Sequence, residues 1–223
     1  LMPFRSPAAV ELFDYAEKQA KLKRNSDSQD VMSMLLRPLK SGEYLTDLEF
    51  KNFLTLVVAA GSDTTRYSIA ASLHAIANHP SLLEQLQRTE DTSWETVTNE
   101  LIRWASPTMH FRRTATQDIE LHGKQIKAGD KVVLWWISGN RDEAVFENPF
   151  SIDPTRDPNP HIAFGQWGPH ACLGQWLARL EVQSVVRAFV KNVKRVTQSG
   201  PHVHLRSNFI NGIKYLPITV ARN

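Results

Sequence analysis

Cysteine is almost absent from this chain of 223 residues, in which Cys172 is the only one. A disulfide within the chain is therefore excluded, because it needs two thiols. An iron–sulfur cluster is excluded because it needs several cysteine ligands. A closed structural zinc site needs about four nitrogen or sulfur ligands, and only His170 stands beside the cysteine. The His202–His204 pair alternates with apolar residues, as in an ordinary strand.

A strong excess of one charge and long apolar runs are also missing. The formal net charge is only +3, and the 26 basic residues are spread along the chain, which indicates a solvated surface and no nucleic-acid binding. No apolar run approaches the ~18 residues of a membrane span. The content of 42% hydrophobic and 22% charged residues is typical of a globular protein with a substantial core.

Helix signals are the most frequent pattern in the chain. A Thr46-x-x-Glu49 capping pattern opens a stretch without proline that extends to residue 78, which predicts one very long helix. Further helices are predicted at 7–23, 30–36, after a cap at Ser81, from a cap at Thr92 to about residue 105, and at 175–191. The fold class predicted is mainly α with small β sheets.

Strand signals are shorter and lie in the second half of the chain. A hairpin is predicted at 119–126 around a His-Gly-Lys turn, and further strands at 131–137, 202–206 and 214–221. Residues 148–160 contain four prolines, which predicts a long irregular loop.

The sole cysteine ends a glycine-rich segment, FGQWGPHACLG, at residues 164–174. A tight turn would hold the thiol at the positive N-terminus of the next helix, which favours the thiolate. A thiolate is a metal ligand or a nucleophile, whereas a lone cysteine is more commonly an inert, small apolar side chain. From this segment alone the three readings stay open.

Three motifs occur in a fixed order: AGSDTT at 60–65, Glu100-x-x-Arg103, and the cysteine segment. In this order they closely resemble the cytochrome P-450 superfamily of heme-thiolate monooxygenases. The resemblance covers nearly all of residues 1–223 as the C-terminal, heme-binding half of such a protein. It implies that the chain belongs to a longer protein with the cytochrome P-450 fold.

The resemblance implies heme b (iron protoporphyrin IX) as the cofactor, with Cys172 as the axial ligand of the iron. It assigns Arg113 and His170 to the heme propionates, and Arg112 is a competing candidate for the first role. The family's usual cysteine motif has one residue fewer, so Trp167 stands in an extended loop. The other residues that the resemblance places against the heme are Gly61, Phe164, Gly168 and Gly174.

Asp63 and Thr64 resemble the family's acid–alcohol pair, which would deliver protons to bound oxygen. Taken alone, these residues could equally form a polar patch on a helix. Glu100 and Arg103 lie at i and i+3, where side chains can pair, and by resemblance Arg156 joins them. We interpret these three residues as a structural triad without a chemical role.

The resemblance places the substrate against three mostly apolar segments, at 57–60, 108–111 and 208–212. The pocket residues assigned in this way are Val57, Ala60, Met109 and Phe209. They favour a hydrophobic substrate, and by analogy a terpene, a sterol side chain or a methyl-branched lipid. His110, His122 and His161 are interpreted as surface or loop histidines.

The implied function is a cytoplasmic bacterial monooxygenase that hydroxylates its substrate with O2. Two electrons would come from a ferredoxin and a ferredoxin reductase, docking on a basic face that includes Arg179 and Arg187. A peroxygenase is one alternative, although such members tend to lack the Asp63–Thr64 pair. A second is a non-catalytic fragment of the parent enzyme. A third, a hydrolase using Cys172 and His170, lacks any oxyanion signature.

Overall fold

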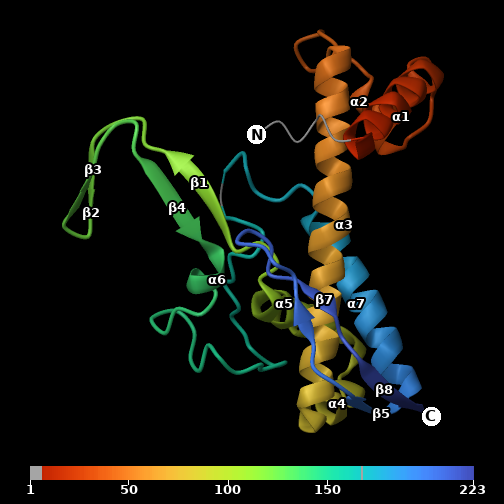
Figure 1. Cartoon of the computed structure of the whole chain (residues 1–223), viewed down its shortest axis with the longest axis vertical. Coiled ribbons are helices and arrows are strands. Elements are labelled where there is room, and N and C mark those ends of the chain that lie inside the picture. Colours follow the sequence, from red (N-terminus) through yellow and green to blue (C-terminus); the bar gives the residue numbers. More distant parts are fainter. Residues whose placement is uncertain (1–6, 167) are drawn as a thin grey trace. The chain divides into compact units, whose positions relative to one another are not determined.

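The structure is a computed structural model that describes residues 7–166 and 168–223, and the predicted loop detail at Trp167 lies outside these residues. The chain divides into two compact units, residues 1–63 and 64–223, with helix α3 (Asp47–Asn78) contributing to both (Figure 1). Within the described ranges no helix is long and apolar enough to cross a membrane.

The first unit contains α1 (Pro7–Lys23), α2 (Val31–Leu35) and the beginning of α3. The predicted capping box is confirmed: the Glu49 N–H donates to Thr46 Oγ1 at 3.3 Å, and the Thr46 N–H donates to Glu49 Oε2 at 2.8 Å. The apolar core of the first unit is formed by Ala16, Ala20, Leu36, Phe50 and Leu54.

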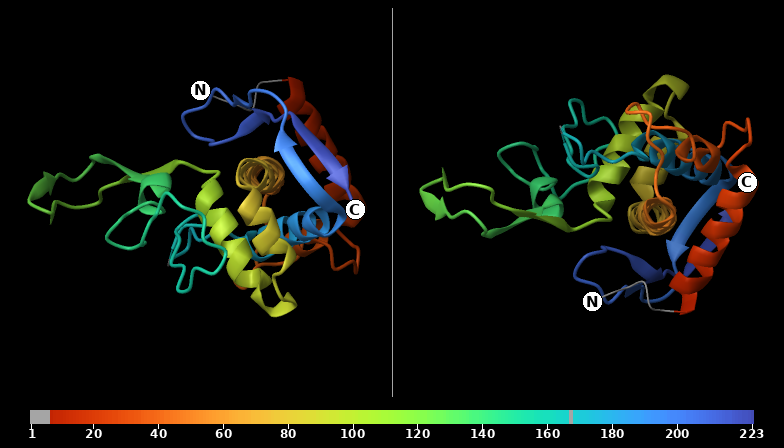
Figure 2. Two further views of the ribbon diagram at one scale, coloured as in Figure 1. Left: turned by 90° about the horizontal axis from the view of Figure 1, so that it is seen from below. Right: turned by 90° about the horizontal axis from the view of Figure 1, so that it is seen from above.

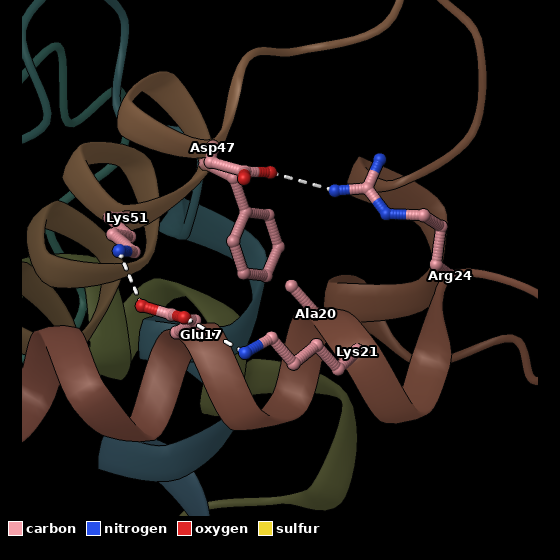
Figure 3. A pocket seen from close by; sticks show the side chains of 7 residues that line it. Glu17, Ala20, Lys21, Arg24, Asp47 and Lys51 are labelled. Atoms are coloured by element: carbon pink, nitrogen blue, oxygen red, sulfur yellow. Dashed lines mark hydrogen bonds and ion pairs between the residues drawn. The ribbon is translucent and has the colours of Figure 1, made fainter.

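Ion pairs tie α1 to α3 in this unit (Figure 3). Glu17 accepts from Lys51 Nζ at 2.9 Å and from Lys21 Nζ at 3.0 Å, and Asp47 accepts from Arg24 at 2.8 Å. Lys51, followed by Lys21, lowers the pKa of Glu17 to about 2. The cavity beside these residues measures about 40 Å³, which admits water but no substrate.

The helices of the second unit pack around one apolar core. They are the remainder of α3, α4 (Pro80–Gln87), α5 (Trp94–Ala105) and α7 (Gln175–Asn192), with a 3₁₀ turn at Asp91–Ser93 before α5. Buried core residues come from all four helices, among them Ile76, Leu86, Leu101 and Val186. The predicted cap at Ser81 is wrong, because α4 begins one residue earlier with Pro80 in its first turn and proline fits that position without losing a hydrogen bond.

Four antiparallel strand pairs complete the unit. They are β1 (His110–Thr114) with β4 (Lys131–Trp135), β2 (Ile119–Leu121) with β3 (Lys124–Ile126), β5 (Val193–Gln198) with β8 (Ile218–Arg222), and β6 (Val203–His204) with β7 (Ile213–Tyr215). The predicted hairpin is confirmed as β2 and β3, with His122 and Gly123 at positive φ in its turn. It extends from the β1–β4 ribbon away from α5 and α7 (Figures 1 and 2).

Two strand predictions need correction, and one further strand was not predicted. The strand predicted at 131–137 ends at Trp135, where the short helix α6 (Trp136–Gly139) begins. The segment predicted at 214–221 is two strands, β7 and β8, and Pro217 between them has no N–H for a strand ladder. Strand β5 was not predicted, because it follows α7 without any glycine or proline between them.

Candidate functional site

The cysteine loop is closed by its own backbone. The Cys172 N–H donates to the Phe164 carbonyl at 2.9 Å, and the Ala171 N–H donates to the Gly168 carbonyl at 3.2 Å. Gly165 and Gly168 have φ values of +69° and +138°, which side chains with a Cβ rarely adopt. Helix α7 begins at Gln175, so the half-buried thiol is held just before a helix N-terminus.

Two side chains suited to carboxylate binding were assigned to the heme propionates. His170 is exposed in the cysteine loop, and Arg113 is exposed on β1. Arg113 Nη1 donates to the Arg112 carbonyl at 3.1 Å, and in the ranges 7–166 and 168–223 no carboxylate pairs with it. Neighbouring strand residues face opposite sides, so Arg112 and Arg113 cannot serve the same face of β1.

Glu100, Arg103 and Arg156 lie together in one buried network. Arg103 binds Glu100 through Nε at 2.7 Å and through Nη2 at 2.8 Å, and Arg156 Nε donates to the same carboxylate at 3.1 Å. The Asp153 N–H and the Asn159 amide also donate to Glu100. The network therefore joins α5 to the proline-rich loop at 148–160.

All five N–H donors of Arg103 have acceptors. Besides the two bonds to Glu100, Nη1 donates to the carbonyls of Asn140 and Pro149 at 2.8 Å, and Nη2 donates to the Ser151 carbonyl at 2.9 Å. Both Glu100 and Arg103 are 0% exposed. Complete pairing is what a buried ion pair requires, because an unpaired buried charge is strongly destabilising.

The residues assigned to proton delivery, to the heme at Gly61 and to the first pocket segment lie in succession on α3. Asp63 and Thr64 are half-buried, as is Val57, whereas Ala60 and Gly61 are exposed. A Cβ added to Gly61 would meet no described atom within 4 Å. A glycine inside a helix costs about 0.5–1 kcal/mol relative to alanine, and no contact within the described chain requires one at this position.

The structure brings the two other pocket segments together. The Met109 N–H donates to the Phe209 carbonyl at 2.9 Å, and Thr108 pairs with Ile210 in an isolated bridge. The Phe209 ring lies 5.5 Å from the Phe111 ring, edge to face. The backbones of Met109 and Phe209 are therefore paired, and the Phe209 ring lies against the Phe111 ring.

Two of the three histidines are not surface residues. His161 is 8% exposed, and burial, with smaller contributions from Arg179 and Arg103, lowers its pKa to about 4. His110 lies 4.7 Å from the Trp135 ring, and its buried Nδ1 has no hydrogen-bond partner among the residues that the structure describes. His122 is exposed in the β2–β3 turn, as predicted. The burial of His161 and His110 depends on distant residues and leaves no local signal in the sequence.

A family model for cytochrome P450 matches residues 12–213. The chain belongs to the cytochrome P450 family. Among its curated relatives are a methyl-branched lipid omega-hydroxylase and a steroid C26-monooxygenase, both of Mycobacterium tuberculosis. The first is 40% identical over 95% of this chain and 49% of its own length, and the second is 38% identical over 93% and 47%.

Solved cytochrome P450 structures share the fold. A Mycobacterium marinum cytochrome P450 in complex with pseudoionone has a TM-score of 0.89 and 37% identity, over 95% of this chain and 51% of that one. A Bacillus megaterium cytochrome P450 in complex with testosterone has a TM-score of 0.87 and 31% identity, over 96% and 59%. The chain spans about half the length of the curated relatives that it matches.

The cytochrome P450 family implies a heme-thiolate cofactor, and the described residues fit one. Cys172 is the only cysteine of the chain and lies directly before the N-terminus of α7. Arg113 and His170 offer N–H groups suited to carboxylates. A Cβ added at Gly168 or Gly174 would meet no described atom within 4 Å, which leaves open space beside the cysteine loop.

Proposed function

We propose that this cytochrome P450 chain is the heme-binding, C-terminal half of a cytoplasmic bacterial monooxygenase that hydroxylates a hydrophobic molecule. A terpene, a sterol side chain or a methyl-branched lipid is the substrate class, in keeping with the names of the relatives. The observation that carries the proposal is the closed loop that holds the only cysteine before α7, through the bond from Cys172 to the Phe164 carbonyl.

In this proposal the Cys172 thiolate holds the iron of heme b, while Arg113 and His170 bind the propionates. Thiolate-bound heme supplies the activation of O2, because the electron-rich sulfur favours O–O cleavage. The paired segments that contain Met109 and Phe209 bind the apolar substrate and exclude water from it. Val57 and Ala60, on α3, are proposed as further substrate contacts.

Asp63 and Thr64 handle protons. The Thr64 hydroxyl holds a water molecule by hydrogen bonding, and the Asp63 carboxylate accepts protons from solvent and passes them to that water. One oxygen atom of O2 enters the substrate and the other leaves as water, which requires two protons and two electrons. The presence of Asp63 and Thr64 argues against a peroxygenase, because such an enzyme takes its oxygen from peroxide and needs no delivery of protons to O2.

Electrons would come from a redox partner, because the single cysteine of this chain cannot hold an iron–sulfur cluster. We propose a ferredoxin, reduced by a ferredoxin reductase, as the donor. The same enzyme assay, run with and without these two proteins, distinguishes this route from peroxide-driven turnover.

The test is to reduce the full-length protein and add carbon monoxide. A Soret band of the thiolate-ligated type is expected, with loss of that band in Cys172→Ser. Ala171→Ser, a neighbouring exposed position, is the matched control and keeps the band. An imidazole-type spectrum, or no heme uptake, contradicts the proposal. Residues 1–223 expressed alone test the fragment alternative: a thiolate spectrum and turnover from that half would refute it.

A further inference from the structure

Asn99 on α5 connects α7 to His161, which lies three residues before the cysteine loop. Its side-chain oxygen accepts a hydrogen bond from Arg179 Nε at 2.9 Å and lies 3.3 Å from His161 Nε2. Asn99 precedes Glu100, which anchors the proline-rich loop, so two adjacent residues of α5 hold α7 and that loop. No motif in the sequence indicates this role for Asn99.

The direction of the His161 bond follows from its other ring nitrogen. The Ala163 N–H donates to His161 Nδ1 at 3.4 Å, so Nδ1 is the acceptor of the neutral ring. Nε2 therefore carries the hydrogen and donates it to Asn99. The Asn99 oxygen thus accepts from both His161 and Arg179, which fixes the orientation of its amide.

Arg179 is positioned by three further contacts. Its guanidinium lies 4.6 Å from the centre of the Phe164 ring and 5.3 Å from the Trp176 ring, and Nη1 donates to Gln175 Oε1 at 3.1 Å. Phe164 is the residue whose carbonyl binds the Cys172 N–H. The guanidinium therefore packs on the residue that closes the cysteine loop.

Arg179 stands in the second turn of α7, the helix that directly follows the cysteine loop. Burial lowers the pKa of Arg179, whereas Glu95 and Cys172 act in the opposite direction. A fixed positive charge near a thiolate reduces the electron density that the sulfur donates to a bound metal.

We propose that Arg179, held by Asn99 and stacked on Phe164, is a positioning residue that sets the donor strength of the Cys172 thiolate. This inference rests on the proposed heme-thiolate function. It departs from the docking role expected for Arg179 from the sequence. Arg187, two turns further along α7, is bound to Asp91 and keeps a side chain that is 40% exposed, so it stays available to a partner protein.

The experiment measures the heme reduction potential of the full-length, heme-loaded protein with small-molecule mediators and no ferredoxin. Arg179→Gln is expected to shift the potential to a more negative value, because the ferric thiolate loses a neighbouring cation. Arg187→Gln makes the same charge change on the same helix and is expected to leave the potential unchanged. A docking role alone predicts slower reduction by ferredoxin with no change of potential.

Asn99→Ser keeps the charge of Arg179 and removes the hydrogen bond that anchors it, so this variant provides the test if Arg179→Gln does not bind heme. A smaller shift in the same direction is expected, with a larger fraction of the carbon monoxide complex at the non-thiolate position. Unchanged potentials in both variants, or equal shifts in Arg179→Gln and Arg187→Gln, overturn the inference. Loss of the thiolate band in the unmodified protein instead contradicts the proposed function.

Discussion

Replacing Arg103 by lysine should be among the most destabilising conservative changes in this protein. The guanidinium satisfies five acceptors from a fully buried position. Lysine keeps the charge but has only three N–H donors, so at least two of the five acceptors lose the hydrogen bond from this side chain. Each such loss costs about 1–3 kcal/mol, and the expected decrease in the free energy of unfolding is about 4 kcal/mol.

Urea unfolding of the full-length protein, followed by far-ultraviolet circular dichroism, measures this decrease. Arg112→Lys on exposed β1 is the matched control, since a surface change of this kind stays within about 0.5 kcal/mol. The midpoint should fall in Arg103→Lys while the dependence on urea keeps its slope. A loss below about 1 kcal/mol would refute the reasoning, because water or relaxation would then have replaced the missing bonds.

Three further changes test other parts of the structure. The pKa of His161 falls from 6.5 to about 4 on folding, so the unfolded chain binds more protons than the folded chain between these pH values. The free energy of unfolding should therefore drop by about 3 kcal/mol as the pH falls from 6.5 to 4. Urea titrations at several pH values measure this drop, and His161→Gln should remove it. Gly212→Ala places a Cβ 2.8 Å from the Tyr67 ring and should cost about 1–3 kcal/mol in thermal unfolding, whereas a stability equal to the wild type would show that the ring moves freely. Asp63→Asn should slow product formation and release more hydrogen peroxide per electron consumed, and unchanged coupling would remove Asp63 from proton delivery.

The sequence predicted the elements whose signals are local. Helix α3 begins at a capping box and contains no proline, so both of its ends were predicted correctly. Strand β5 was missed because its pairing with β8 spans more than twenty residues of chain and leaves no local mark. Trp135 and Trp136 continue an apolar run, so the change from strand to helix between them depends on tertiary contacts.

In the candidate site, too, the residues with local sequence signals were predicted, and the contacts that depend on folding were missed. The thiol and its loop carry their own glycine signals, and Glu100 and Arg103 have the spacing of a helix pair. The contacts that surround Cys172 were hidden, because Asn99, His161 and Arg179 are brought together only by folding. Arg179 was therefore expected at a docking surface, although its guanidinium packs on Phe164.

Adjacent residues of α5 project about 100° apart around the helix axis, so Asn99 and Glu100 reach Arg179 on α7 and the proline-rich loop from one rigid element. A single-residue insertion or deletion within α5 before this pair would rotate both anchors at once and misplace both of their partners. Length changes at the exposed β2–β3 turn would disturb neither. Among chains that share this arrangement, insertions and deletions should accumulate at that turn and be excluded from the α5 turn that carries the two anchors.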